Sequence, residues 1–517
     1  MAGKQELEKQ VGRLLIGRVP ATDLTPEYKA ALEAGTVGGI CLFRENAETL
    51  EQLATLIGDA VSASSHVPVV CTDQEGGAVQ RFDRAITPLP SAMALAASAD
   101  EETVEKITCL SARQLKMLGV NCLLAPVLDV ISNFANPIVS TRAFGISPDK
   151  VAKFGRIVAE AISAEGIVPV GKHFPGHGAT TEDSHVALAI NKLPVEALWK
   201  KDIAPFKTIL DALPIVLTGH IWVSEIDEEP LPASLSPRIT ESILRGYLGF
   251  KGIVMTDDMV MKGITASFGL GEACVRAVEA GADLVLVCGS FAELQEAFDA
   301  LLAAAKSGRI SAERLEDSRK RIKEQFSKKP VTCDPEKQER KFTRLTKLIK
   351  DGERLSYTAS IKGISILRGH IPELAGSKWT VLVPDHPRYS LDLHKHILET
   401  LGVDESVIAV RRYPLQPSFN EATAITEEMK GQNVVFVTFR ALHFEEQFRL
   451  AQMVADITRE KVAVCTDTPF DLHGLPDWPN VLATHDPSDQ AMKAMAQVFA
   501  TRIATGSSPV QSDPVPV

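Results

Sequence analysis

Residues 166–189 read GIVPVGKHFPGHGATTEDSHVALA, a short apolar run followed at once by a polar loop. The part from Lys172 onward holds three histidines, one lysine and two acids, and glycine and proline interrupt it. Barrel enzymes of the α/β class carry their reacting residues in loops of this kind, directly after buried parallel strands. The stretch therefore predicts a strand that delivers titratable side chains to a catalytic face.

Apolar runs of strand length alternate with helix-patterned segments between residues 12 and 325. About eight such repeats over ~310 residues predict a parallel sheet, and a closed (β/α)8 TIM-like barrel is the α/β fold of that size. An open doubly wound sheet is the alternative, although no Gly-x-Gly-x-x-Gly fingerprint follows an early run. The predicted strands are Arg13–Arg18, Val37–Phe43, Val67–Asp73, Val120–Val130, Gly166–Phe174, Pro214–His220, Gly252–Asp258 and Ala282–Gly289.

Polar side chains stand at the downstream ends of five of these runs. In a parallel barrel the carboxyl ends of all strands open on one face, so these side chains are expected to converge there. A single aspartate at a strand end is explained by a helix N-cap, but that explanation does not extend to five strands. The residues are Asp73, Asp129, Lys172 with His173, His220 and Asp257.

A second domain is predicted after the barrel. Residues 1–327 form the expected catalytic barrel, and a charged, proline-containing linker follows over 328–352. Six further apolar runs with helices between them predict a three-layer α/β sandwich over 353–505. Asp467, after one of these runs, is a candidate for a contribution to the barrel mouth. The tail 506–517, rich in serine and proline, is expected to be disordered.

The composition indicates which classes of binding partner are disfavoured. The 517-residue chain has a formal net charge of −11, which disfavours nucleic acid and anionic membrane surfaces because both carry the same sign. No apolar run reaches the ~18 residues needed to span a bilayer, and the charged N-terminus lacks a signal segment, so a cytoplasmic location is expected. The eight cysteines form no Cys-x-x-Cys pair, so neither a zinc site nor a redox motif is indicated.

Four segments resemble glycoside hydrolase family 3, and most closely its β-N-acetylglucosaminidase branch. KHFPGHG at 172–178 with DSH at 183–185 is similar to the catalytic loop of that branch, and LGFKGIVMTDDM at 248–259 to the nucleophile strand. DQEGGAVQR at 73–81 resembles a substrate-binding segment, and PASLSP at 232–237 a further block of the family. The resemblance covers the whole barrel in order and extends to the two-domain form.

The resemblance implies roles for individual residues. Asp257 is implied as the nucleophile and His185 as the acid/base, with Asp183 orienting its ring. Imidazole titrates near pH ~6.5, so donating a proton at neutral pH requires no large pKa shift. Asp258 is expected to be structural, because successive side chains of a strand face opposite sides. The residues implied to bind sugar hydroxyls are Asp73, Arg81, Arg142, Lys172 and His173.

The activity implied is that of a retaining exo-β-N-acetylglucosaminidase without cofactor or metal, acting on glycosides that contain N-acetylglucosamine. In a bacterium this activity implies the recycling of cell-wall muropeptides. A β-N-acetylglucosaminide phosphorylase, a β-glucosidase and a non-catalytic sugar-binding barrel are alternatives on the same scaffold. A metal-dependent hydrolase is disfavoured because no His-x-His stands at a strand end. Its ligands would be His173, His177, His185 and His220.

Overall fold

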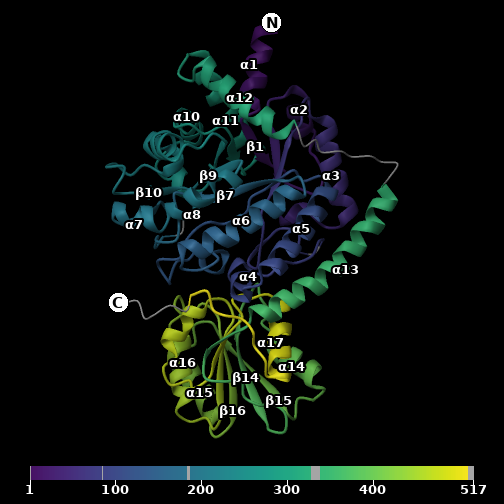
Figure 1. Cartoon of the computed structure of the whole chain (residues 1–517), viewed down its shortest axis with the longest axis vertical. Coiled ribbons are helices and arrows are strands. Elements are labelled where there is room, and N and C mark those ends of the chain that lie inside the picture. Colours follow the sequence, from purple (N-terminus) through teal and green to yellow (C-terminus); the bar gives the residue numbers. More distant parts are fainter. Residues whose placement is uncertain (1, 84, 183–186, 328–337, 511–517) are drawn as a thin grey trace.

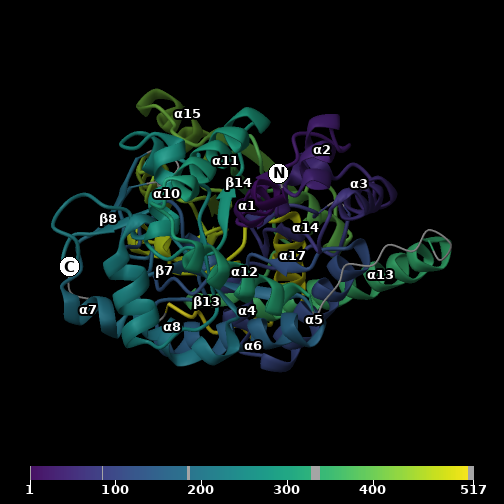
Figure 2. The same ribbon diagram turned by 90° about the horizontal axis from the view of Figure 1, so that it is seen from above.

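The computed structural model describes residues 2–83, 85–182, 187–327 and 338–510 of the chain. A barrel extends to α12 (Ala312–Phe326), and the long helix α13 (Gln338–Gly363) leads from it into a smaller sandwich. Figure 1 shows the barrel above the sandwich, with α13 running along one side towards the junction. In the view from above, α13 lies at the same side of the barrel as α5 (Glu101–Leu118), on which it packs (Figure 2).

Eight parallel strands form the barrel sheet in the spatial order β11-β9-β7-β6-β3-β2-β1-β12. The two ends of this order meet, because Met255 bridges to Leu284 and the N–H groups of Asp283 and Leu284 donate to the Val254 carbonyl. This closure confirms the predicted barrel and excludes the open doubly wound sheet. The strands are β1 (Leu15–Arg18), β2 (Gly39–Leu42), β3 (Val69–Thr72), β6 (Cys122–Leu123), β7 (Val168–Phe174), β9 (Ile215–Thr218), β11 (Ile253–Thr256) and β12 (Val285–Val287).

Each of the eight predicted runs contains one of these strands, although the strands are shorter than the runs. The greatest difference is in Val120–Val130, of which only Cys122–Leu123 is a strand. Pro126 lies in the remainder of this run, and a proline has no N–H with which to continue a ladder. The other runs lose one to three residues at the first end and at most two at the last end.

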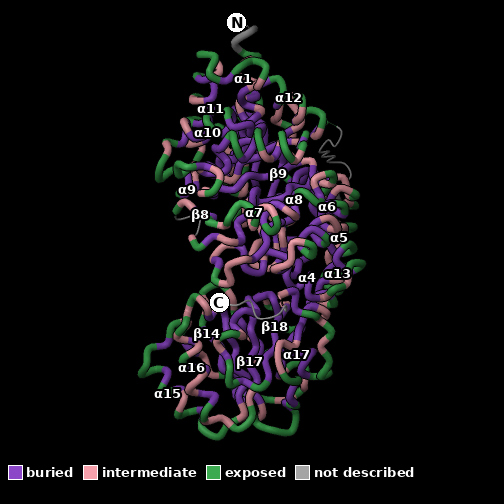
Figure 3. Tube along the Cα trace, turned by 60° about the vertical axis from the view of Figure 1, so that its left-hand side comes forward, coloured by how far each residue is buried: buried purple, intermediate pink, exposed green. Residues whose placement is uncertain are grey.

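Two apolar layers hold the barrel together. Small side chains fill part of its interior, where the register pairs Cys41 with Cys71 and Cys71 with Cys122 on three adjacent strands. The outer faces of the strands pack against amphipathic helices and form the larger core cluster. Figure 3 shows the buried trace at the centre of each domain and exposed segments outside.

Several helices of the barrel begin and end at residues with capping chemistry. In α5 the Asp100 side chain accepts from the Thr103 N–H at 3.0 Å, and Gly119, with φ of 111°, ends the helix. The other helices of this domain are α1 (Ala2–Gly12), α2 (Pro26–Ala34), α3 (Leu50–Ala63), α4 (Ala92–Ser98), α6 (Pro148–Ala164), α7 (Val195–Lys200), α8 (Ile203–Ile209), a π-helix (Arg238–Tyr247), α9 (Lys262–Thr265), α10 (Leu270–Glu279) and α11 (Phe291–Lys306). Short strand pairs in the loops are β4 (Gln74–Gly76) with β5 (Val79–Gln80) and β8 (Ala189–Asn191) with β10 (Ile221–Val223).

The second domain is the predicted three-layer α/β sandwich. Its sheet has the order β13-β18-β17-β16-β14-β15 and is parallel except for β13, which pairs antiparallel to β18. Helices α14 and α17 cover one face, while α15 and α16 cover the other. The elements are β13 (Ser365–Arg368), β14 (Trp379–Asp385), α14 (Leu393–Leu401), β15 (Ile408–Pro414), α15 (Phe419–Met429), β16 (Asn433–Thr438), α16 (Glu446–Ala455), β17 (Lys461–Cys465), β18 (Val481–Ala483) and α17 (Asp489–Thr501).

Helix α13 belongs to both hydrophobic cores. Leu345 and Ala359 are buried in the core cluster of the barrel, whereas Ile361 packs against the cluster of the sandwich. At Gly352 the helix comes so close to the barrel that an added Cβ would lie 2.2 Å from the Thr87 hydroxyl oxygen. Helix α13 therefore connects the two domains and also packs against both of them.

The ends of the predicted segments differ from the structure in two places. Residues 328–337 of the expected linker lie outside the described residues, but 338–352 form the first part of α13, because this charged stretch has an apolar face to bury on the barrel. The tail was expected to be disordered from residue 506, yet Gly506 bridges to Ser365 on the edge strand β13 and Ser508 is buried. Residues 511–517 lie outside the described part. No helix among the described residues is both long and apolar enough to cross a membrane.

Candidate active site

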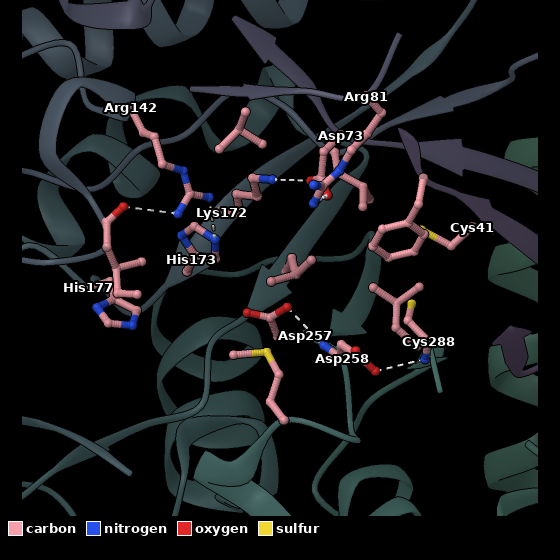
Figure 4. Close-up of a pocket in the computed structure, with 17 residues that line it drawn as sticks. Cys41, Asp73, Arg81, Arg142, Lys172, His173, His177, Asp257, Asp258 and Cys288 are labelled. Carbon is pink, nitrogen blue, oxygen red and sulfur yellow. Dashed lines mark hydrogen bonds and ion pairs between the residues drawn. The ribbon is translucent and has the colours of Figure 1, made fainter. Parts of the chain in front are cut away.

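A pocket of about 230 Å³ lies at the carboxyl ends of the barrel strands (Figure 4). Its seventeen lining residues come from the ends of barrel strands and from the loops that follow them. Four of the polar residues predicted to converge on one face line it, namely Asp73, Lys172, His173 and Asp257. This is the face on which barrel enzymes carry out their chemistry.

Lys172 is held between two carboxylates. Its Nζ lies 2.7 Å from Asp73 Oδ1 and 2.5 Å from Glu75 Oε1. Asp73 also accepts from the Arg81 guanidinium at 2.9 Å. Burial alone raises the pKa of Asp73, but Lys172 and Arg81 hold it well below its usual value. Burial alone lowers the pKa of Lys172, but the two carboxylates raise it, so all of these groups stay charged at neutral pH.

Arg142 comes from the 3-10 turn η2 (Ser140–Arg142) and makes a bidentate ion pair. Its Nε and Nη2 atoms donate to the two Glu75 oxygens at 2.8 and 2.9 Å. Nη2 also lies 3.3 Å from His173 Nε2, and His173 Nδ1 lies 2.7 Å from Asp129 Oδ2. Because a guanidinium only donates, Nε2 accepts from Arg142 and Nδ1 is the ring atom that faces the Asp129 carboxylate. Burial alone raises the pKa of Asp129, but His173 and His177 lower it to about 2.

Asp257 follows strand β11, and its carboxylate faces the pocket (Figure 4). The Asp257 N–H donates to the Thr218 carbonyl at 3.0 Å, which fixes the residue to the end of β9. Its Oδ1 accepts from the Asp258 N–H at 2.8 Å. Burial alone raises the pKa of Asp257, but His220, His173 and the Asp258 N–H hold it below its usual value. The carboxylate is therefore ionised at neutral pH and rigidly placed.

Asp258 has a different environment from its neighbour. Its Oδ1 accepts from the N–H groups of Cys288 at 2.8 Å and Val260 at 3.3 Å, so the carboxyl group ties β11 to the loop after β12. Burial raises its pKa to about 7. These contacts agree with the structural role expected for Asp258, although the residue also forms part of the pocket wall.

Two further histidines make structural contacts near the pocket. The His177 N–H donates to Asp129 Oδ1 at 2.7 Å, and burial lowers the pKa of the His177 ring to about 4. The His220 ring lies between the Ser234 hydroxyl at 2.8 Å and the Asp258 carbonyl at 2.9 Å. In the described ranges, no group of three or more His, Cys, Asp and Glu side chains is arranged to hold a metal ion.

The structure brings six of the eight predicted site residues to one pocket. The two others, Asp183 and His185, fall within 183–186 and lie outside the described residues. The six are Asp73, Arg81, Arg142, Lys172, His173 and Asp257.

Glu75 is a charged residue beside the pocket that was not among the predicted site residues. Its side chain is 4% exposed and pairs with both Arg142 and Lys172. Burial alone raises the pKa of Glu75, but Arg142 and Lys172 lower it. A signal was present in the sequence, since Glu75 stands two residues after Asp73 and alternation places i and i+2 on one side of an extended chain.

Comparison with known proteins identifies the family to which these features belong. Residues 6–324 match the family described as "Glycosyl hydrolase family 3 N terminal domain". A curated β-hexosaminidase from Idiomarina loihiensis is 33% identical over 292 residues, which are 56% of this chain and 87% of the relative. A curated β-hexosaminidase from Xanthomonas campestris pv. campestris is 37% identical over 285 residues, 53% of this chain and 84% of the relative.

Among solved structures, a glycoside hydrolase family 3 β-N-acetylglucosaminidase from Paenibacillus sp. str. FPU-7 has a TM-score of 0.86 to this chain. It is 30% identical, and the match covers 98% of both chains, so it includes the barrel and the sandwich. The family match spans the barrel whose strand ends carry the charged pocket. The chain therefore belongs to glycosyl hydrolase family 3 and is a glycoside hydrolase.

Proposed function

We propose that the protein is a retaining exo-β-N-acetylglucosaminidase that releases terminal β-linked N-acetylglucosamine. The observation that carries the proposal is the ionised Asp257 carboxylate, fixed at a strand end and facing the charged pocket. The choice of sugar is supported by the relatives, which are named β-hexosaminidase or β-N-acetylglucosaminidase. The recycling of muropeptides and a cytoplasmic location stay predictions.

In the first step, the Asp257 carboxylate attacks the anomeric carbon of the bound sugar while the glycosidic carbon–oxygen bond breaks. The departing oxygen takes a proton from His185, the acid/base that the family resemblance implies. In the second step, the same imidazole takes a proton from water as the water oxygen attacks the anomeric carbon and displaces Asp257. Two inversions at that carbon give overall retention.

The low pKa of Asp257 suits both steps. A carboxylate that is already ionised attacks without first losing a proton, and its negative charge attracts the positive charge that develops on the sugar ring. Asp258, whose pKa is raised to about 7 and whose Oδ1 accepts two backbone N–H groups, is the poorer nucleophile of the pair.

Lys172 and the charged side chains around it can contact sugar hydroxyls. The Lys172 ammonium has three donors, and its contacts to Asp73 and Glu75 use two of them, so the third can serve a hydroxyl group. Asp73 can accept from a hydroxyl while it holds Arg81 and Lys172 in place. Sugars with vicinal hydroxyls fit a site in which donors and acceptors alternate over short distances.

The test compares p-nitrophenol release from the β-N-acetylglucosaminide and the β-glucoside, with and without phosphate and with EDTA. We expect faster release from the N-acetylglucosaminide, free N-acetylglucosamine as the product in phosphate buffer, and no effect of EDTA. A sugar 1-phosphate product would instead identify a phosphorylase, and preference for the glucoside would identify a β-glucosidase. Loss of activity in EDTA would favour a metal hydrolase, and no release from either glycoside would favour a sugar-binding protein.

A further inference from the structure

One carboxylate of the sandwich domain contacts the barrel turn that carries Arg142. Asp467 lies two residues after strand β17 and is fully buried. Its Oδ2 accepts from the Ser140 hydroxyl at 3.1 Å, and its Oδ1 accepts from the Thr141 hydroxyl at 3.3 Å. Arg440, after strand β16, donates its Nε to Oδ2 at 2.6 Å. Asp467 thus lies in the domain interface and does not line the pocket, unlike the direct contribution to the barrel mouth considered from the sequence.

The backbone at this contact is held in an unfavourable conformation. Ser140 has φ of 38° and Arg440 has φ of 46°, so both residues that donate to Asp467 Oδ2 lie in the left-handed region. For residues other than glycine such a conformation is unfavourable and persists only where surrounding contacts determine it. The hydrogen bonds of Asp467 are contacts of that kind, and they join the two strained residues across the interface.

Apolar packing surrounds the same turn. Val139 and Ala143, which flank η2, share a buried cluster with Phe470 of the sandwich. The Phe470 ring also stacks on Phe134 of the barrel with a centroid distance of 4.1 Å. The sandwich therefore fixes η2 by polar contacts to its first two residues and by apolar contacts on either side of it.

Arg142 is the third residue of η2 and lines the pocket, so the position of the turn sets the position of its side chain. The Arg142 guanidinium contacts Glu75 and His173, so a displacement of the turn would break its contacts with both residues. We propose that Asp467 is a positioning residue for glycoside binding, which acts from the second domain by setting the place of Arg142. The inference rests on the proposed function, in which Arg142 belongs to the sugar-binding pocket.

The test removes the contact by changing the barrel residues, because these changes do not remove the buried charge of Asp467. The double variant Ser140→Ala/Thr141→Val deletes both hydroxyl donors and leaves the ion pair of Asp467 with Arg440 in place. Asp467→Asn is the corresponding change from the sandwich side. The control is Asp486→Asn, which alters another buried carboxylate of the interface. Asp486 accepts from the Ser91 N–H at 2.7 Å, at the start of α4, which contributes no residue to the pocket lining.

For Ser140→Ala/Thr141→Val and for Asp467→Asn we expect KM for the β-N-acetylglucosaminide to rise by about tenfold, with kcat changed much less. The control should keep KM within about twofold of the wild-type value, even if its melting temperature falls as far as that of the test variants. In an Arg142→Ala background, Ser140→Ala/Thr141→Val should add no further rise in KM, because the residue through which it acts is gone.

Two results would overturn the inference, and they are distinguishable. If Arg142→Ala raises KM but Ser140→Ala/Thr141→Val leaves it at the level of the control, Asp467 has only a structural role and the proposed sugar site stands. If Arg142→Ala itself leaves KM unchanged, the role of Arg142 in the proposed function fails, and the positioning role of Asp467 fails with it.

Discussion

The guanidinium of Arg142 donates to Nε2 of His173 over 3.3 Å and thereby fixes the tautomer of the histidine ring. Asp129 accepts from the other ring nitrogen at 2.7 Å. The pocket is thus a continuous network, in which charged side chains orient one another.

The clearest prediction concerns Asp257. Asp257→Ala should lower kcat for the β-N-acetylglucosaminide by roughly 10³-fold or more, because the other carboxyl group at that strand end, Asp258, is held by the N–H groups of Val260 and Cys288. A 2-fluoro mechanism-based inhibitor should form an adduct on Asp257 that mass spectrometry of peptides locates. Asp317→Ala, at an exposed helical position, is the control and should keep wild-type activity. An adduct on Asp258 would contradict the assignment.

Asp183 and His185 are predicted to act as one unit. His185→Ala should lose most activity on glycosides with poor leaving groups and keep much of it on p-nitrophenyl glycosides, which need little protonation. Because residues of one unit have non-additive effects, Asp183→Ala/His185→Ala should be little slower than His185→Ala. The measurement is kcat/KM over a series of leaving groups, and multiplicative losses would show that the two residues have separate roles.

Glu75 should matter for both stability and binding. Glu75→Gln leaves two buried cations, Arg142 and Lys172, without a shared anion, so we expect the free energy of unfolding to fall by about 3 kcal/mol and KM to rise. Urea unfolding measures the first effect. Glu45→Gln is a matched control, because the pair of Glu45 with Arg18 is partly exposed and should contribute less than about 1 kcal/mol. Equal losses in the two variants would refute the prediction.

Asp202 gives a prediction for pH dependence. Its carboxyl group is buried, accepts from Asn191 Nδ2 at 2.6 Å, and has its pKa raised by burial to about 7. Since the unfolded chain loses this proton near pH ~4, the free energy of unfolding should fall as pH rises from about 4 to about 7. Asp202→Asn should reduce that slope, by an amount on the order of a few kcal/mol over the range. Chemical denaturation across this range tests it, and identical slopes in the wild type and the variant would contradict it.

The sequence allowed the barrel, the sandwich and four pocket residues to be predicted because these depend on local patterns, whereas Arg81 and Arg142 were implied only by the family resemblance. Strand-length apolar runs end in polar residues, and the parallel topology then brings the ends together. The contacts that tune the site could not be predicted in this way. Glu75 meets Arg142 across 67 positions and Asp467 meets Ser140 across 327, so both pairs depend on how distant segments pack. The charged start of α13 has a sequence typical of a linker, and its apolar face becomes evident only against the barrel.

Helix α13 has a consequence for how the molecule unfolds. Leu345 and Ala359 complete the core of the barrel, while Ile361 packs on that of the sandwich. Removing the sandwich together with α13 would leave apolar surface of the barrel in contact with water, and melting one domain would withdraw packing from the other. Barrel and sandwich should therefore unfold in a single cooperative transition, and limited proteolysis should not release either as an intact fragment.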